Sequence, residues 1–338
     1  MRSAVMVSPG KIEFHDIEKP VPGPGQVLLK ITRIGICGSD VHVNHGRHPF
    51  TSYPVIQGHE FSSVVAEVGE GVENVRVGMK ATATPQVVCG RCAPCRRGDY
   101  NICNELKVWG FQTSGVAQDF FAVSAGKIVP LPDDFTEEMG ALVEPVAVAV
   151  HSTSRAGDLR SKNVVVAGAG PIGNLVAQVC SSRGANVLST DLSGYRLDVA
   201  RMCGIRNTAN LASEPLSAAA VRVFGSTGFD IAIECSGSQG AISDLVANVN
   251  KGGRIIIVGV FQDKPRIDMS IIGDRELSLA GSLMYRKPDF EEAVRLMSRG
   301  EIRTTPLDSR HFPYSEFPAA YRFIDEAKDR IMKVFIDF

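Results

Sequence analysis

Residues 164–173 read VVVAGAGPIG, an apolar run followed at once by a glycine-rich turn. The run Val164–Ala167 is typical of a parallel strand that is buried on both faces. A helix is expected next, because apolar residues recur at i, i+3, i+4 and i+7 from Ile172 to Val179, and Gly184 offers a C-terminal stop. The sequence therefore predicts a strand, a tight turn and a helix in immediate succession.

The turn of this unit matches the pattern G-x-G-x-x-G. Gly168 permits the tight turn, Gly170 lets the backbone approach a pyrophosphate, and Gly173 allows the helix to pack closely on the strand. Pro171 suits the first helical position, and the helix N-terminus that continues through Ile172 offers free N–H groups to phosphates. Glycine-rich turns are common, but the predicted strand before this one and the helix after it favour a dinucleotide site.

Asp191, 18 residues after Gly173, ends the second expected strand. A carboxylate there accepts hydrogen bonds from ribose hydroxyls and repels a 2′-phosphate, so it predicts NAD rather than NADP. A helix N-cap is its alternative role. Arg196 is expected beside the adenosine half, unless it is an ordinary solvated arginine. The nicotinamide half is expected at later turns and strand ends, at Ser236, Val258, Gly259, Val260 and Ser282.

Apolar runs and helical stretches alternate through the middle of the chain. Further strands are expected at 186–190, 229–234, 254–258 and 277–281. This alternation predicts an α/β fold with a doubly wound parallel sheet. The first 130 residues are instead rich in short apolar stretches separated by turn residues, which is typical of a mostly β domain. A helix near 289–299 and a strand at 333–336 are expected in the tail, which the pattern alone assigns to neither domain.

Length and composition narrow the class of protein. The 338 residues are enough for two domains, and 44% apolar and 22% charged residues are ordinary for a globular chain. The formal net charge of −1 gives no electrostatic reason to expect a nucleic acid or a membrane as partner. No apolar run approaches the roughly 20 residues that span a bilayer, and no signal peptide is expected. We therefore expect a cytoplasmic enzyme.

Four of the eight cysteines lie close together in the sequence. Such a cluster in a reducing compartment favours metal binding over disulfides. Its spacing is compatible with a closed tetrahedral zinc site made of four thiolates. An iron–sulfur cluster or free thiols are the alternatives. The sequence predicts a structural zinc ion at Cys89, Cys92, Cys95 and Cys103.

A second set of potential metal ligands is dispersed. Cys37, His59 and Glu60 offer a thiolate, an imidazole and a carboxylate, which suit a catalytic zinc ion that keeps an open coordination position. Each of these residues alone would be unremarkable. Glu144 lies in an apolar stretch, where a carboxylate needs a partner such as a metal ion or its bound water. The sequence thus predicts a second zinc site.

Together these residues resemble the zinc-containing medium-chain dehydrogenases, and within them the polyol branch that includes the sorbitol dehydrogenases. The resemblance implies a β-rich, GroES-like catalytic domain at 1–151 and 287–338, with a Rossmann cofactor domain at 152–286 inserted between these segments. It also implies a homo-oligomer, either a dimer or a tetramer. The resemblance covers essentially the whole chain and is carried by residues 35–42, 58–60, 89–103, 144–145, 168–173 and 191–196.

The resemblance also assigns roles to individual residues. It implies Cys37, His59 and Glu60 as ligands of the catalytic zinc ion, with Glu144 as a fourth ligand or as a partner of bound water and substrate. Zinc would polarise the substrate hydroxyl, and the carbinol hydride would pass to NAD. The hydroxyl proton is expected to leave through Ser39, with His42 as a further candidate in the relay.

Two departures from the sorbitol dehydrogenases weaken the case for sorbitol itself. Val43 stands where they have a substrate-contacting tyrosine. Met284 stands where they have a substrate-binding arginine, while Arg286 lies just beyond as a candidate partner for a carboxylate. We expect oxidation of a secondary alcohol of a polyol or sugar-derived substrate, with L-threonine and sugar acids as alternatives. A dinucleotide-binding protein without turnover is disfavoured, because none of the expected catalytic residues is missing.

Overall fold

The computed structural model describes residues 1–338, and the chain divides into two units. The β-rich unit comprises Met1–Glu144, Arg286–Val294 and Asp308–Phe338. The doubly wound unit comprises Pro145–Tyr285 and Arg295–Leu307. None of the helices is both long enough and apolar enough to cross a membrane.

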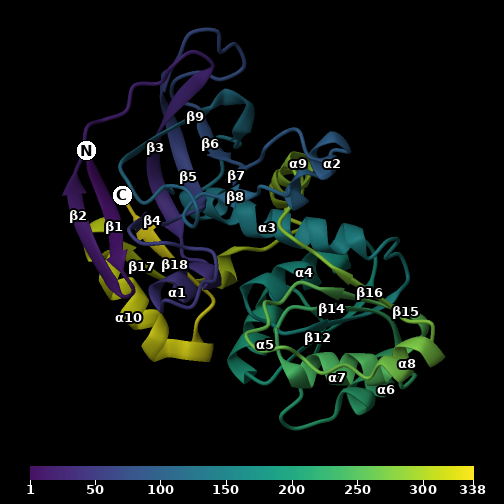
Figure 1. Ribbon diagram of the computed structural model, residues 1–338. Helices are drawn as coiled ribbons and strands as arrows, with labels where there is room; N and C mark the ends of the chain where they lie inside the picture. The colour runs from purple at the N-terminus through teal and green to yellow at the C-terminus, as the bar shows by residue number, and fades with distance from the viewer. The chain divides into compact units, whose positions relative to one another are not determined.

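Six strands form one parallel sheet in the doubly wound unit, in the order β13-β12-β11-β14-β15-β16. Helices α4 and α5 lie on one face of this sheet, and α6 and α7 lie on the other (Figure 1). The predicted α/β fold with a doubly wound sheet is therefore confirmed. The elements are β11 (Asn163–Ala167), α4 (Pro171–Ser182), β12 (Asn186–Asp191), α5 (Gly194–Met202), β13 (Asn207–Asn210), α6 (Leu216–Phe224), β14 (Phe229–Glu234), α7 (Gln239–Asn248), β15 (Val249–Ile257), α8 (Met269–Asp274) and β16 (Ser278–Gly281).

Strand β13 is not predicted by the sequence pattern. Its residues Asn207–Asn210 read NTAN, which has neither an apolar run nor an apolar alternation. β13 pairs only with β12, at the edge of the sheet, so its side chains need not be apolar. The expected strand at 254–258 also proved to be the end of a longer strand that begins at Val249.

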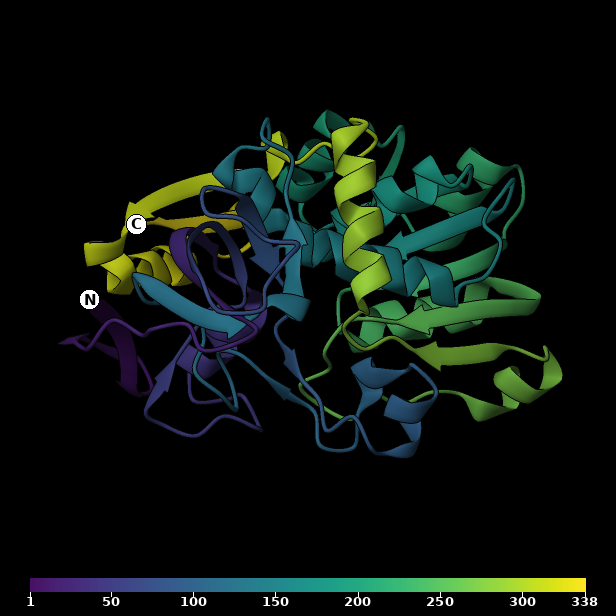
Figure 2. The same cartoon turned by 90° about the horizontal axis from the view of Figure 1, so that it is seen from above.

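The β-rich unit is organised around β3, which pairs with β5, β9 and β18. β18 pairs antiparallel with β3, so the C-terminal strand lies beside an N-terminal one, as the adjacent yellow and purple strands show (Figure 1; Figure 2). The strands are β1 (Arg2–Ser8), β2 (Lys11–Asp16), β3 (Gln26–Gly35), β4 (Val55–Ile56), β5 (Glu60–Val68), β6 (Lys80–Ala83), β7 (Gln86–Val87), β8 (Lys107–Val108), β9 (Phe120–Ser124), β10 (Ile128–Pro130), β17 (Asp308–Pro313) and β18 (Lys333–Asp337).

Three helices belong wholly to the β-rich unit: α1 (Gly38–Asn44), α2 (Ala93–Arg96) and α10 (Phe317–Ala327). Helices α3 (Glu137–Arg155) and α9 (Lys287–Ser298) each contain a boundary between the units. The boundary that we expected after residue 151 also falls inside α3. Residues Arg295–Leu307 belong to the doubly wound unit, whereas we expected the whole of 287–338 in the β-rich domain. Gln178 of α4 holds this segment, because it accepts a hydrogen bond from Arg303 N at 2.6 Å and donates one to Arg303 O at 3.1 Å.

The glycine-rich turn brings α4 against β11 as the sequence predicts. Gly168 has φ +94°, a conformation that side chains disfavour. A Cβ atom added at Gly173 would lie 1.7 Å from the backbone oxygen of Gly168. The first turn of α4 can therefore pack this closely only because position 173 has no side chain.

We expect Gly173→Ala to destabilise the doubly wound unit. The clash is with backbone, which cannot move aside as a flexible side chain would, so the cost should reach at least the roughly 1–3 kcal/mol typical of overpacking. Thermal unfolding followed by circular dichroism measures this loss. Gly194→Ala is the matched control, because an added Cβ there meets nothing within 4 Å. Equal unfolding temperatures for the two variants would contradict the packing argument.

Candidate functional site

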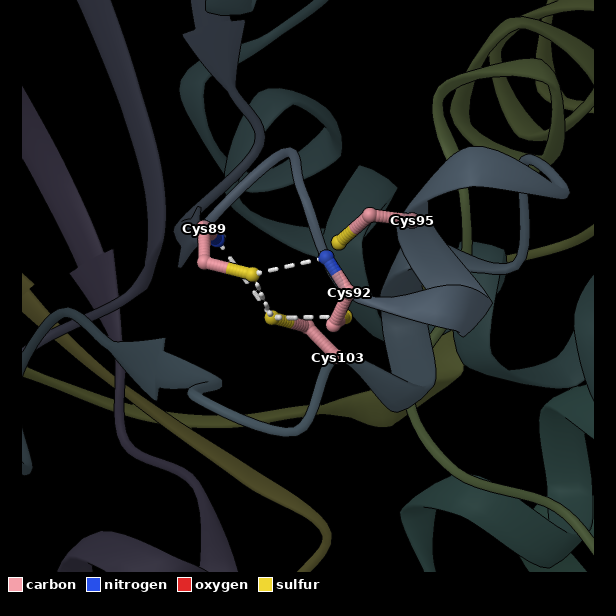
Figure 3. Close-up of side chains that lie close together, drawn as sticks. All are labelled: Cys89, Cys92, Cys95 and Cys103. Carbon is pink, nitrogen blue, oxygen red and sulfur yellow. Dashed lines mark hydrogen bonds between the residues drawn. The ribbon is translucent and has the colours of Figure 1, made fainter.

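The four clustered cysteines converge on one point (Figure 3). Their sulfur atoms all lie within 4.8 Å of one another, and all four are free thiols. Cys89 N donates to Cys103 Sγ at 3.3 Å, and Cys92 N donates to Cys89 Sγ at 3.4 Å. Backbone N–H groups that point at sulfur are typical of a site whose cysteines carry negative charge.

The chemistry of this donor set fits a divalent cation. Backbone N–H groups of Asn104 and Cys95 lower the pKa of the Cys92 thiol to about 6. Burial and hydrogen bonding to Cys92 raise the pKa of Cys95 to about 12. One sulfur therefore ionises readily while its neighbour resists, and a bound zinc ion would remove this conflict by stabilising all four thiolates.

Arg286 contacts the lobe that carries these cysteines. Its Nη1 lies 3.4 Å from Asp99 Oδ1, and the next backbone N–H, of Lys287, donates to Tyr100 Oη at 2.5 Å. Its place in the sequence, just beyond Met284, makes Arg286 a candidate partner for a substrate carboxylate. The structure instead engages it with Asp99, an acid that the sequence pattern did not connect to it.

The dispersed set Cys37, His59 and Glu60 also comes together. One ligand atom from each residue lies within 4.8 Å of those of the other two. Cys37 immediately precedes α1, and Glu60 begins β5. His59 and Glu60 are 4% and 1% exposed, so a cation between these side chains would be shielded from bulk water. The spacing of residues 37 and 59 along the chain does not by itself bring them together. They meet because β3 pairs with β5.

A lysine that the sequence analysis missed holds Glu60 in place. Lys333 Nζ lies 2.6 Å from Glu60 Oε2 and donates to Ile36 O at 3.2 Å. Burial lowers the pKa of Lys333, but the charges of Glu60 and Cys37 and the hydrogen bond to Glu60 together outweigh burial, and the pKa is raised. A Cβ at Gly35 would lie 2.6 Å from Glu60 Oε2, so this glycine leaves the space that the carboxylate occupies. The only sequence signal was a lysine at the start of an apolar strand.

Burial and nearby acids set the charges around His59. Burial raises the pKa of the Cys37 thiol, and the charge of Glu60 raises it further. Burial would lower the pKa of His59, but Asp40 and Cys37 outweigh it and hold that pKa well above the usual value. The buried acids Asp40, Glu60 and Glu144 outnumber the buried basic residues beside them, Lys333 and His59. This excess of negative charge fits a metal cation at the Cys37 set.

Asp40 is the second residue that the sequence analysis missed. It is buried in α1, and its Oδ2 accepts a hydrogen bond from Cys37 N at 3.0 Å. Its Oδ1 lies 3.7 Å from His59 Nδ1, a nitrogen that has no hydrogen bond. A carboxylate beside the outer nitrogen of a metal-binding histidine orients the ring and fixes its tautomer.

The remaining predicted residues of this site, Glu144, Ser39 and His42, are not among the residues whose ligand atoms converge. Glu144 is 5% exposed and acts electrostatically on His59 and Lys333, but it is not one of the three residues whose ligand atoms converge within 4.8 Å. Ser39 and His42 are three residues apart on α1, which places them on one face of the helix. Burial lowers the pKa of His42, and the charges of His45 and Arg47 add to this effect.

The doubly wound unit gathers the predicted cofactor residues at one edge of its sheet. The turn Gly168–Gly173 follows β11, and Asp191 is the last residue of β12. Asp191 Oδ2 accepts a hydrogen bond from Ala169 N at 2.6 Å, and Oδ1 accepts one from Ser193 N at 2.8 Å. Because the carboxyl ends of parallel strands share one edge, these residues lie where doubly wound folds bind dinucleotides.

Arg196 lies beside the glycine-rich turn. Its Nη1 would be 3.9 Å from a Cβ at Gly170, and its Nε is buried without a hydrogen bond. A buried guanidinium N–H without an acceptor is costly, so this atom fits a ligand oxygen, such as one from a ribose or phosphate. This unpaired N–H favours a dinucleotide-binding turn over a glycine-rich turn that binds no ligand.

Glu234 organises the other predicted cofactor segment and was missed from the sequence. It is fully buried at the end of β14, and its Oε1 accepts hydrogen bonds from Ser236 N at 2.8 Å and Gly237 N at 2.9 Å. A Cβ at Gly259 would lie 2.4 Å from Gly237 N, so the two turns touch backbone to backbone. The expected nicotinamide-side residues follow these strand ends, at Ser236, Val258, Gly259, Val260 and Ser282.

Comparison with known families identifies both units. Residues 23–133 match the alcohol dehydrogenase GroES-like domain, and residues 171–299 match the zinc-binding dehydrogenase family. These matches agree with the β-rich unit that carries both sets of metal ligands and with the doubly wound unit that carries the glycine-rich turn.

Three relatives are similar over almost their whole length. A 2-dehydro-3-deoxy-L-galactonate 5-dehydrogenase of Pseudoalteromonas atlantica is 36% identical over 93% of this chain and 91% of its own. A sorbitol dehydrogenase of Halalkalibacterium halodurans is 33% identical over 96% of each chain. An L-threonine 3-dehydrogenase of Rhizobium etli is 31% identical over 94% of this chain and 93% of its own.

Solved structures show the same fold. An Escherichia coli alcohol dehydrogenase in complex with NADH has a TM-score of 0.92 at 28% identity, covering 100% of this chain and 99% of that one. A Sinorhizobium meliloti structure bound to NADP has a TM-score of 0.93 at 28% identity and the same coverage. With its converged thiol, imidazole and carboxylate donors, its dinucleotide-type sheet edge and these matches, the chain belongs to the zinc-containing medium-chain alcohol dehydrogenase family.

Proposed function

We propose that this protein oxidises a secondary alcohol of a polyol or sugar-derived substrate and transfers the hydride to NAD. The observation that carries the proposal is the convergence of Cys37 with the buried residues His59 and Glu60 within 4.8 Å, in a chain that also carries a dinucleotide-type turn. When bound, zinc supplies Lewis acidity towards the substrate hydroxyl, and NAD supplies the hydride acceptor.

The chain's own residues then have distinct tasks. Cys37, His59 and Glu60 would hold the catalytic zinc ion, with Glu144 as a fourth ligand or a partner of bound water. Ser39 and His42, on one face of α1, would carry the hydroxyl proton away from the substrate oxygen. The four clustered cysteines would hold a second, structural zinc ion. The family resemblance further supports a cytoplasmic homo-oligomer, a dimer or a tetramer.

The charges of the β-rich unit bear on the substrate class. Asp40 and Glu144 make the surroundings of His59 negative, whereas Glu60 is paired with Lys333, and this negative charge favours a neutral, hydroxyl-rich substrate over a free carboxylate. The similarity to a sorbitol dehydrogenase agrees with this choice.

The 36% identical relative, whose name denotes a sugar-acid enzyme, supports an acidic substrate as the second candidate. A carboxylate needs a cation, and Arg286 is engaged with Asp99. His48 offers a hydrogen-bond donor instead of a cation: its ring stacks on Phe111 at 4.6 Å, Phe111 contacts the ring of His59 at 5.0 Å, and burial lowers the pKa of His48, which favours its neutral form.

We expect two zinc ions per chain in the purified protein, held by independent sites. His59→Ala should lose one zinc ion and all turnover while the fold persists. Cys103→Ser should lose the other and lower the unfolding temperature, because a closed four-thiolate site contributes directly to folding. Elemental analysis and thermal unfolding measure both effects. Cys203→Ala, a core cysteine outside both sets, should retain two zinc ions. One zinc ion or iron in the wild type would reject this assignment.

We expect a preference for NAD over NADP of at least tenfold, because Asp191 repels a 2′-phosphate. Two unit charges about 4 Å apart repel by roughly 4 kcal/mol at an effective dielectric constant near 20, before screening by salt. Asp191→Asn, which removes only the charge, should erode the preference in kcat/KM. Asp198→Asn removes an exposed acid of α5 and should leave it unchanged. Equal use of both cofactors by the wild type would show that Asp191 does not select the cofactor.

We expect C4–C6 polyols or sugar acids to exceed ethanol by at least tenfold in kcat/KM. The test is a panel of polyols, inositols, aldonates, L-threonine and short alcohols with NAD. If an aldonate leads, His48→Gln should lower its kcat/KM more than that of a polyol of equal length, and Arg286→Ala should not change the ranking. A ranking led by ethanol or L-threonine would refute the proposed substrate class.

A further inference from the structure

A buried chain of hydrogen bonds leads from α10 to the Cys37 set. Tyr321 on α10, Gln57 just before His59, and Asp40 on α1 are 3%, 2% and 2% exposed. Tyr321 Oη lies 2.8 Å from Gln57 Oε1. Gln57 Nε2 lies 3.1 Å from the backbone oxygen of Asp40 and 3.4 Å from its Oδ1. Segments far apart in the sequence thus share one polar network inside an apolar core.

The direction of each hydrogen bond in this network is determined by chemistry. The backbone and carboxylate oxygens of Asp40 only accept, so the Gln57 amide nitrogen must face them. The Gln57 carbonyl oxygen consequently faces Tyr321, whose hydroxyl must donate. Tyr321 therefore fixes which way the Gln57 amide points, and Gln57 in turn fixes the position of Asp40.

The position of Asp40 matters because both of its oxygens face the candidate metal site. Oδ2 accepts from Cys37 N, and Oδ1 lies 3.7 Å from His59 Nδ1. That separation is just beyond a hydrogen bond, and His59 Nδ1 has no other partner. Because Nδ1 faces Asp40, Nε2 is the ring nitrogen that remains for a metal ion. A small shift of Asp40 toward His59 would let its carboxylate accept a hydrogen bond from Nδ1–H. The proton would then stay on Nδ1, and Nε2 would keep a lone pair for a metal ion.

We propose that Gln57 and Tyr321 are positioning residues of the catalytic zinc site, acting through Asp40 on His59 and Cys37. This inference rests on the proposed function. It makes α10, although it contributes no ligand, part of the support of the metal site. The network orients Asp40 toward both ligands and resists its displacement when the metal ion leaves or returns.

The alternative is that Tyr321 only fills the core, where its ring stacks on Phe317 with a centroid separation of 5.7 Å. Tyr321→Phe separates the two roles, because it keeps the ring and removes only the hydroxyl. Tyr314→Phe is the matched control in the same unit. Tyr314 is also 3% exposed, and its hydroxyl donates to Ala117 O at 3.0 Å, outside the network. Both variants lose one buried hydrogen bond, so a loss of stability alone cannot distinguish them.

The experiment measures zinc release to a chromogenic chelator, with the phase from the Cys37 set identified by its absence in His59→Ala. We expect Tyr321→Phe to accelerate that phase about tenfold, the lower end for partners behind a metal ligand, and to leave the four-cysteine phase unchanged. We also expect kcat to fall while KM for NAD stays constant, and the visible spectrum of the cobalt-substituted protein to change. Tyr314→Phe should match the wild type in all of these readouts.

Gln57→Met, which nearly preserves volume but breaks both links, provides a second variant if Tyr321→Phe does not fold. Combining the two substitutions should add nothing to Gln57→Met, because Tyr321 acts only through Gln57. Unchanged zinc release and cobalt spectra in both single variants would overturn the positioning role and leave the proposed function intact. A wild type without a zinc ion that His59→Ala removes would instead refute the proposed function.

Discussion

Lys333 and Glu60 meet inside the β-rich unit, with 2.6 Å between the ammonium nitrogen and the carboxylate oxygen and hardly any exposure to water. Removing one partner of such a pair leaves an unpaired buried charge, at a cost of about 3–5 kcal/mol. The pair ties β18, near the C-terminus, to the start of β5, and it does so beside β3, which pairs with both strands. The position of Glu60, and with it the geometry of the Cys37 set, depends on this contact.

The two sets of metal ligands illustrate two ways to hold a cation. The four cysteines lie within one short lobe, where backbone N–H groups already point at sulfur. Such a site encloses its ion and stabilises a segment that has little core of its own. The Cys37 set is assembled instead from α1 and the start of β5, and its charge is adjusted by Lys333, Asp40 and Glu144. This arrangement suits an ion that keeps a position open for a substrate.

Features that depend on residues close together in the sequence were predicted well, and contacts between residues far apart in the sequence were not. The turn Gly168–Gly173 and its flanking strand and helix were predicted closely, because each glycine meets a backbone constraint within a few residues. The edge strand β13 was missed because an edge position tolerates polar residues. The contact of Arg286 with Asp99 was not predicted, because the two residues lie 187 positions apart in the chain.

By itself, the sequence determined which chemistry this protein can hold: local spacing specified a four-thiolate lobe and a dinucleotide turn, and the residue types offered thiol, imidazole and carboxylate donors. Only the tertiary structure decided which polar residues support those donors. The supporting roles of Lys333, Asp40, Gln57 and Tyr321 could not be predicted from the sequence, because a buried polar residue is recognised by its partner, and here most partners lie on other elements. Burial makes each of these contacts energetically important, and it is the folding of the chain that creates the burial.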